Sequence, residues 1–188
     1  MASSGQHDLS PVHFLAPILG VSQKELESLS TLSVEYPGVT ISDVGRKLTA
    51  AELGPLKGAE GHLPRVTCAE LKSDVVYHLA FFDPDAPEDP TKNGPFGDWQ
   101  WLVLGLSNDD LTSSADTAAF VKKQVMAHDG PNPPAGEGQH RYVFVLFEGS
   151  SEVSKPAGEP KSWLFKKFVE ENMGNLQPIG LNYYFAEQ

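Results

Sequence analysis

Apolar residues dominate three segments that are long enough for strands and show no helical period. β-Branched and aromatic side chains dominate these segments, and both faces of each strand would be apolar. We therefore predict that the three segments are central strands of a sheet that is covered on both sides. They span residues 74–83, 98–106 and 140–148. Shorter segments of similar composition predict further strands at 34–41, 65–71 and 178–187.

Helical patterns cover less of the chain. Ser22 and Glu25 stand at the spacing of a capping box and predict a short helix after them. The clearest helical periodicity lies in residues 161–174, and a further helix is predicted over residues 112–130, ending at a glycine. Because strands dominate, a mostly β fold (a β-rich α+β domain) with peripheral helices fits better than a doubly wound sheet.

The length of 188 residues predicts one domain, residues 1–188, with residues 1–20 as an extended or flexible N-terminal segment. The formal net charge of −11 disfavours nucleic acid and loose adhesion to anionic membranes, because both require a basic surface. A single cysteine excludes an intramolecular disulfide. No basic leader precedes the first apolar run, and no run is long enough for a transmembrane segment. We expect a cytoplasmic monomer.

Several kinds of site are disfavoured by spacing. The six histidines are scattered, and no pair stands at the spacing of transition-metal ligands. The D-x-D sequence after residue 82 lacks the glycine and glutamate that a calcium loop requires. Phosphate-binding loops and the nucleophile elbow of serine hydrolases are also missing. We therefore expect neither a metal nor a cofactor.

Candidate chemistry gathers in two loops that adjoin predicted strands, one starting at Asp83 and one ending at His140. Alternate side chains of a strand point to opposite faces, so His140 and Tyr142 share a face and Arg141 takes the other. An arginine in an apolar strand needs a carboxylate partner, because an unpaired buried charge is costly. Asp85 or Asp83 is the natural candidate.

These residues also have plainer interpretations. An Asp that precedes Pro commonly caps or forms a turn, and His140 has the alternative of being an ordinary buried histidine. An enzyme is a further alternative, namely a small-molecule hydrolase in which Asp83 is the base and His140 the acid. Against it, the sequence offers neither an activated nucleophile nor a set of metal ligands.

Taken together, the two loops and their strands resemble the phosphatidylethanolamine-binding protein family. The motif "DPDAP" at 83–87 is followed by a Trp-containing strand and then by "GxGxHRYVF" at 136–144, in the family's order. "YPGVTISDVGRKLTAAEL" and "FKKFVEENMGNLQPIGLNYYFAE" extend the resemblance over residues 34–187. The resemblance favours a fungal-type member.

The resemblance implies two antiparallel sheets in a Greek-key-like arrangement, with a small anion pocket at one end. It also implies a cis peptide bond before Pro87. Arg141 would form a structural ion pair. The ligand-binding residues that the resemblance implies are Asp83, Asp85, Pro87, Trp101, Asn132, Pro134, His140 and Tyr142.

Trp101 departs from the family pattern, because many relatives have a second pocket histidine there. An indole offers one donor and no cationic state, which predicts weakened or redirected phosphate binding. Members of the family are generally not enzymes, and several inhibit a kinase cascade or a protease. We therefore expect a non-catalytic binding protein for a phosphate-bearing small molecule or phospholipid head group, which regulates a serine carboxypeptidase or a signalling kinase.

Overall fold

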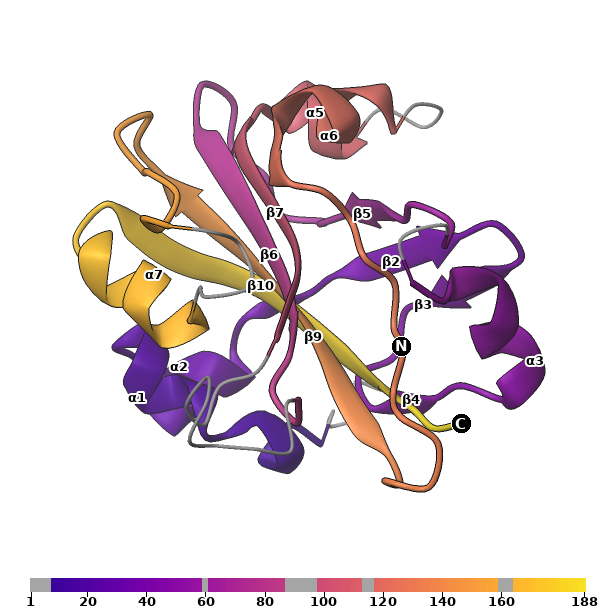
Figure 1. Ribbon diagram of the computed structural model, residues 1–188. Coiled ribbons are helices and arrows are strands. Elements are labelled where there is room, and N and C mark those ends of the chain that lie inside the picture. Colours follow the sequence, from indigo (N-terminus) through magenta and orange to yellow (C-terminus); the bar gives the residue numbers. More distant parts are fainter. Residues whose placement is uncertain (1–7, 59–60, 87–97, 113–116, 159–163) are drawn as a thin grey trace, which may run out of the picture.

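The computed structural model describes residues 8–58, 61–86, 98–112, 117–158 and 164–188. A seven-stranded sheet forms its centre, and a three-stranded sheet packs against one face (Figure 1). The large sheet has the strand order β1-β10-β9-β6-β7-β8, with β4 also paired to β10, and the small sheet has the order β3-β2-β5. The predicted mostly β fold with two sheets is confirmed, whereas the Greek-key arrangement stays a prediction.

Four long strands carry the large sheet. They are β6 (Val76–Asp83), β7 (Asp98–Leu106), β9 (His140–Gly149) and β10 (Leu176–Ala186). Short strands complete both sheets: β1 (Ser30–Thr31), β2 (Ser33–Tyr36), β3 (Val39–Ile41), β4 (Arg46–Lys47), β5 (Arg65–Thr67) and β8 (Gln124–Met126). The long strands pair antiparallel, while β1 and β4 run parallel to β10.

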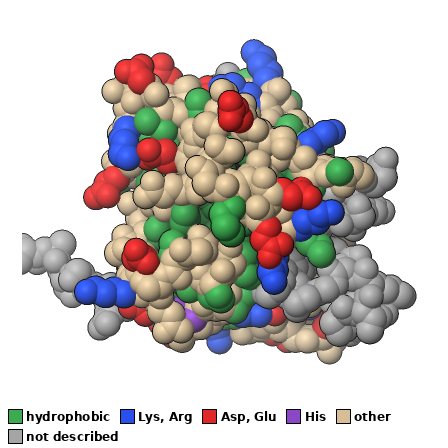
Figure 2. All heavy atoms as spheres, turned by 90° about the vertical axis from the view of Figure 1, so that its left-hand side faces the viewer, with side chains coloured by type: hydrophobic (Ala, Val, Ile, Leu, Met, Phe, Trp, Pro, Cys, Tyr) green, Lys and Arg blue, Asp and Glu red, His purple; other side chains and the backbone are tan. Residues whose placement is uncertain are grey.

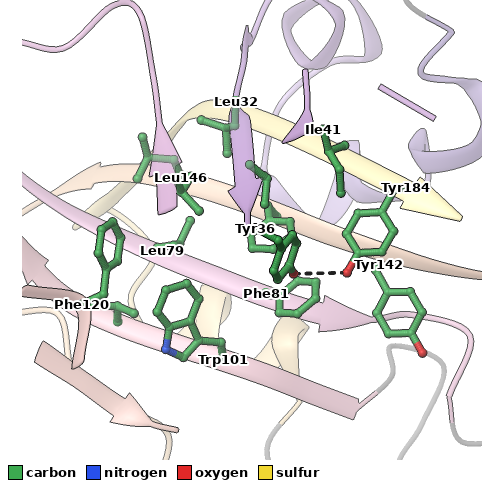
Figure 3. Packing of buried hydrophobic residues seen from close by; sticks show 14 of the residues in the cluster. Leu32, Tyr36, Ile41, Leu79, Phe81, Trp101, Phe120, Tyr142, Leu146 and Tyr184 are labelled. Atoms are coloured by element: carbon green, nitrogen blue, oxygen red, sulfur yellow. Dashed lines mark hydrogen bonds between the residues drawn. The ribbon is translucent and has the colours of Figure 1, made fainter. Parts of the chain in front are cut away.

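The long strands are apolar on both faces because each face covers a separate core. On β9, Tyr142 and Phe144 point into the core between the two sheets, and Val143 and Val145 point into the core on the opposite face. Figure 3 shows the first core, in which the Tyr36 and Tyr184 hydroxyls lie 3.3 Å apart and form a hydrogen bond. The period-two alternation of strand side chains thus produces both cores from one sequence run.

The helices that the structure describes are α1 (Leu15–Leu19), α2 (Gln23–Glu27), α3 (Ala50–Leu53), α5 (Asn108–Thr112), α6 (Ala118–Lys123) and α7 (Phe165–Glu171), with short 3-10 turns η1 (Ser10–Val12) and η2 (Gly54–Leu56). Helices α1, α2 and α7 pack on the second face of the large sheet, whereas α3, α5 and α6 add residues to the core between the two sheets (Figure 1). The predicted capping box is confirmed: Ser22 and Glu25 bond each other's backbone amides at the start of α2. Within the described residues, none of these helices is both long and apolar enough to cross a bilayer.

Residues 8–20 do not form the extended or flexible segment that we predicted. They fold into η1 and α1 and bury Leu9, Val12, Leu15 and Leu19 on the outer face of the large sheet. The apolar side chains recur at helical spacing, so folding hides them from water. Residues 1–7 lie outside the described part of the chain.

The predicted helix over residues 112–130 is wrong in its second half. Helix α6 ends at Lys123, and the next residues become β8 on the edge of β7, where Leu102 pairs with Met126. An open strand edge offers unpaired backbone groups, and pairing with them outweighs continuing the helix. Residues 113–116, near the start of the predicted helix, lie outside the described residues.

Candidate functional site

Asp83 and His140 meet where β6 ends and β9 begins. The two strands run antiparallel, so the last residue of β6 lies beside the first residues of β9. His140 Nδ1 donates to Asp83 Oδ2 at 2.9 Å. The side chains are only 5% and 3% exposed, so the pair is shielded from water. A charge-assisted bond in such a place is stronger than one at the surface.

The other oxygen of Asp83 shapes the loop that follows β6. Asp83 Oδ1 accepts hydrogen bonds from the backbone N–H groups of Asp85, at 2.9 Å, and Ala86, at 3.2 Å. This is the turn-forming role that Asp commonly plays before Pro. The turn and the contact with His140 thus occur together, each using one carboxylate oxygen.

His140 lies between two carboxylates. The hydrogen bond from its ring to Asp83 raises the pKa of His140, while burial opposes the shift. Its second ring nitrogen, Nε2, faces Glu137 Oε2 at 3.5 Å. Sequence reasoning missed Glu137, although its position three residues before His140 was a signal for a local contact.

Arg141 points to the opposite face and pairs with Asp85, as the strand alternation predicted. Its Nε and backbone N–H both donate to Asp85 Oδ2, at 2.9 and 2.7 Å, and its Nη2 donates to Oδ1. Burial raises the pKa of Asp85, but the hydrogen bonds and charge of Arg141 outweigh burial, so the pKa falls below its ordinary value. Of the two partners that the sequence left open, the structure selects Asp85.

The same arginine holds the N-terminal segment. Its Nη1 donates to the carbonyl of Pro11, and its guanidinium lies 4.8 Å from the centre of the Phe14 ring. Tyr183 on β10 adds a hydrogen bond from its hydroxyl to the carbonyl of Asp8, at 2.7 Å. Residues 8–14 are therefore fixed beside the Asp83–Asp85 turn.

The proline-rich loop before β9 is tied to the core at two points. The backbone N–H of Asn132 donates to the Tyr142 hydroxyl at 3.1 Å, and the N–H of Gly130 donates to Gly58 O at 2.9 Å. A Cβ on Gly130 would stand 1.7 Å from the Leu56 carbonyl oxygen, so only glycine allows this approach.

Farther along the loop, Pro134 is exposed and its carbonyl accepts a hydrogen bond from the N–H of Glu137. Gln188 Nε2 donates to Asn132 Oδ1 at 3.0 Å, which places the last residue of the chain over the loop.

Trp101 lies in the core between the two sheets, away from the Asp83–His140 pair. It is fully buried, and its indole N–H donates to Gln124 Oε1 at 3.1 Å. No contact that the structure describes joins Trp101 to Asp83 or His140. Its assignment as a ligand-binding residue stays a prediction.

His128 lies against Trp101 and was missed by the sequence analysis. Its ring stacks on Phe81 and meets the edge of Trp101 at centroid distances of 5.8 and 5.4 Å. Its Nε2 is buried and has no hydrogen-bond partner among the described residues. Burial lowers the pKa of His128 to about 4, so the imidazole is neutral at pH 7. No strand or helix pattern in the sequence marked this histidine as buried.

Two further predictions concern Pro87 and metal binding. Pro87 and the predicted cis bond before it lie outside the described residues. In the described part of the chain, no group of three His, Cys, Asp or Glu side chains gathers in a way that could hold a metal ion.

Comparison with known proteins places this chain in a family. The carboxypeptidase Y inhibitor of Saccharomyces cerevisiae is 27% identical over 154 residues, which cover 70% of this chain and 68% of that protein. Among solved structures, a carboxypeptidase Y inhibitor complexed with its cognate proteinase has a TM-score of 0.65 and 21% identity, and covers 96% of this chain and 93% of that one. A phosphatidylethanolamine-binding protein from Plasmodium vivax has a TM-score of 0.59 and 19% identity, and covers 86% and 88% of the two chains. At these identities the two solved structures show a shared fold.

The family model described as phosphatidylethanolamine-binding protein matches residues 37–185. That span holds Asp83, His140 and Arg141, and it includes most of the chain. This protein therefore belongs to the phosphatidylethanolamine-binding protein family.

Proposed function

We propose that the protein is a non-catalytic binding protein that takes a small phosphate-bearing group, free or as a phospholipid head group, at His140. The observation that carries the proposal is the buried Asp83–His140 pair, in which the 2.9 Å hydrogen bond raises the pKa of His140. A protonated imidazole donates from both nitrogens. With Nδ1 bonded to Asp83, Nε2 is the donor that remains for a ligand.

The loop before β9 supplies further donors at low entropic cost. Pro131, Pro133 and Pro134 have no N–H but restrict the backbone, so little freedom is lost when a ligand binds. The amides of residues 135, 136 and 138 and the Asn132 side chain are the candidate donors, since the amide of Glu137 already donates to the Pro134 carbonyl. Because Asp83 and Asp85 stand nearby, we expect modest affinity for anions.

The proposed partner is a serine carboxypeptidase. The similarity to the carboxypeptidase Y inhibitor of Saccharomyces cerevisiae supports this part of the proposal. Residues 8–14, which Arg141 holds beside the candidate site, are a segment through which such a partner could be contacted. Regulation of a signalling kinase, which the family resemblance also implied, stays a prediction.

The hydrolase alternative is disfavoured by the contacts of Asp83. One of its oxygens accepts from His140 and the other accepts two backbone N–H groups. A general base needs a free lone pair within reach of the proton that it removes. Three of the roughly four lone-pair sites of Asp83 are already taken, so this carboxylate has little capacity left to act as a base.

Titration by NMR tests the binding proposal. Inorganic phosphate and phosphoethanolamine should shift the resonances of Tyr142 and Asn132 in the wild-type protein, and His140→Ala should abolish the shifts. Lys72→Ala is the matched control, because it removes a cation at the opposite end of β9 and should bind like wild type. Equal shifts around Tyr142 in wild type and His140→Ala would contradict the assignment of His140.

An enzyme assay tests the partner. The purified chain should slow peptide hydrolysis by carboxypeptidase Y in proportion to its concentration. Removal of residues 1–14 should weaken this inhibition. Unimpaired hydrolysis at micromolar concentrations of the full chain would refute this partner and leave the anion-binding proposal standing.

A further inference from the structure

The ring of His140 has two nitrogens, and both face carboxylates. Nδ1 donates to Asp83 at 2.9 Å, and Nε2 lies 3.5 Å from Glu137 Oε2. The first contact is a full hydrogen bond between side chains that are almost completely buried, whereas the second is longer and involves a Glu137 side chain that is 23% exposed. The contact with Glu137 is therefore much the easier of the two to break.

We propose that Glu137 occupies the anion position on His140 and so determines which ligands the site accepts. This inference rests on the proposed function, because it concerns the donor that a phosphate-bearing ligand would use. Nε2 is that donor, and it already faces a carboxylate of the same chain. A ligand oxygen must displace Glu137 before it can reach Nε2.

The loop around Glu137 is suited to such a displacement. Gly136 and Gly138 flank it with φ angles of 85° and 87°, a left-handed conformation that glycine adopts without strain. A Cβ at either position would have no neighbouring atom within 4 Å, so the space around this part of the loop is open. Glu137 can therefore leave His140 without disturbing the Asp83–His140 bond.

Displacement of a carboxylate has a consequence for ligand choice. With Asp83, Asp85 and Glu137 facing His140 and Arg141, the local side chains carry three negative charges and at most two positive ones. Tyr142 adds no charge, because burial raises its pKa. A bare phosphate would meet an uncompensated Glu137. A phosphate ester that also carries an ammonium group would pair this cation with the displaced carboxylate.

Isothermal calorimetry with two probes tests the role of Glu137. We expect Glu137→Gln to bind inorganic phosphate roughly tenfold more tightly than wild type, because a carboxylate next to the ligand is removed. The affinity for phosphoethanolamine should increase clearly less, so the preference of the site for this ammonium-bearing probe over phosphate should shrink. Glu137→Asp should lie between wild type and Glu137→Gln. Glu152→Gln, an exposed carboxylate at the other end of β9, changes net charge equally and should bind both probes like wild type.

The outcomes separate the two proposals. If wild type binds phosphate and Glu137→Gln binds it no more tightly, the role of Glu137 is wrong and the proposed function stands. If Glu137→Gln and Glu152→Gln gain the same affinity for phosphate, net charge explains the effect and the role of Glu137 is again wrong. If no variant binds either probe, the proposed function fails and this inference fails with it.

The titration of His140, followed by NMR without ligand, is a second readout. Glu137→Gln should lower the pKa of His140, because a nearby negative charge is lost. An unchanged pKa would show that the Glu137 contact is absent in solution and would overturn the inference.

Discussion

The two ends of β9 each carry an ion pair, and the two pairs differ in the exposure of the cation and in the number of hydrogen bonds that it donates. At the site end, Arg141 and Asp85 are 25% and 26% exposed and share three hydrogen bonds. At the far end, Lys72 Nζ and Glu148 Oε2 lie 2.8 Å apart, but the Lys72 side chain is 67% exposed. The two carboxylates are similarly exposed, Glu148 at 23% and Asp85 at 26%, so the pairs differ in the cation: a guanidinium fork at one end and a flexible, exposed ammonium at the other.

The surroundings of each pair explain the contrast. The far end opens onto a surface hollow of about 370 Å³ lined by residues 28–30, 70–72, 148 and 179, so water reaches both charges of the pair. The side of the molecule where β10 begins shows hydrophobic side chains amid scattered acidic and basic ones (Figure 2). The site end is covered by residues 8–14 and by the Asp83–Asp85 turn. The same type of charge pair therefore organises structure at one end and remains solvated at the other.

Arg141→Ala should produce the largest effect. It leaves Asp85 without its partner and releases the carbonyl of Pro11, so we expect a loss of about 3 to 4 kcal/mol in the free energy of unfolding, near the lower end for a buried pair because the side chain is partly exposed. Urea denaturation at pH 7 measures the loss. Amide exchange should also become faster in residues 8–14 than in β10. An unchanged melting temperature would mean that Arg141 is solvated, like Lys72.

The pH dependence of that loss sharpens the assignment to Asp85. A carboxylate whose folded-state pKa is lowered stabilises the fold above its unfolded value, here 3.8, and this stabilisation fades as the pH falls through the lowered pKa. The difference between wild type and Arg141→Ala should therefore be constant near neutral pH and shrink below pH 3.8. A difference that does not shrink would argue against an ionised partner.

His128→Phe should produce the next largest effect, and only in acid. Burial lowers the pKa of His128 from 6.5 to about 4, so the unfolded chain binds a proton in this interval and the folded chain does not. Stability from this group is fully present above pH 6.5 and falls as the pH drops toward 4. Between pH 7 and 4.5, wild type should lose on the order of 2 to 3 kcal/mol more than His128→Phe. Denaturation curves across this range give the difference.

Phe120→Leu is the matched control for His128→Phe, because it alters a ring that packs on the same Trp101. It removes no titratable group, so its effect on stability should be the same at every pH. Parallel pH profiles for wild type and His128→Phe would show that the buried imidazole does not titrate as described.

Lys72→Ala should produce the smallest effect. The ammonium is exposed, so its attraction to Glu148 is screened by water and salt. We expect a melting temperature within the scatter of wild type. A loss comparable to that of Arg141→Ala would break the contrast between the two ends of β9.

The candidate site was partly predictable because some of its geometry is local. In residues 140–147, side-chain alternation separates His140 and Tyr142 from Arg141, and the need of Arg141 for a carboxylate follows from the cost of an unpaired charge. The choice of Asp85 over Asp83 was not predictable. It depends on the turn after β6, in which Asp83 bonds the amides of Asp85 and Ala86 and thereby leaves Asp85 to face Arg141.

The errors in the fold have a related physical origin. The segment 112–130 has the residue pattern of a helix, yet residues 124–126 pair with the open edge of β7. This edge exists only once the sheet has formed, so the segment's own pattern does not predict the pairing. Residues 8–20 were predicted to be extended or flexible, because their own sequence does not indicate which surface they pack against. That surface is formed by the outer face of the sheet, α7 and Arg141.

Periodicity and motif order are properties of the chain, so they were enough to predict the mostly β fold, the family, and the facing of side chains within each long strand. Three contacts could be found only in the folded structure: Glu137 faces His140, His128 is buried against Trp101, and the N-terminal segment lies beside the site. These are contacts between loops and between distant segments. Their geometry depends on backbone conformations that no spacing rule fixes, so they appear only when the whole chain is folded.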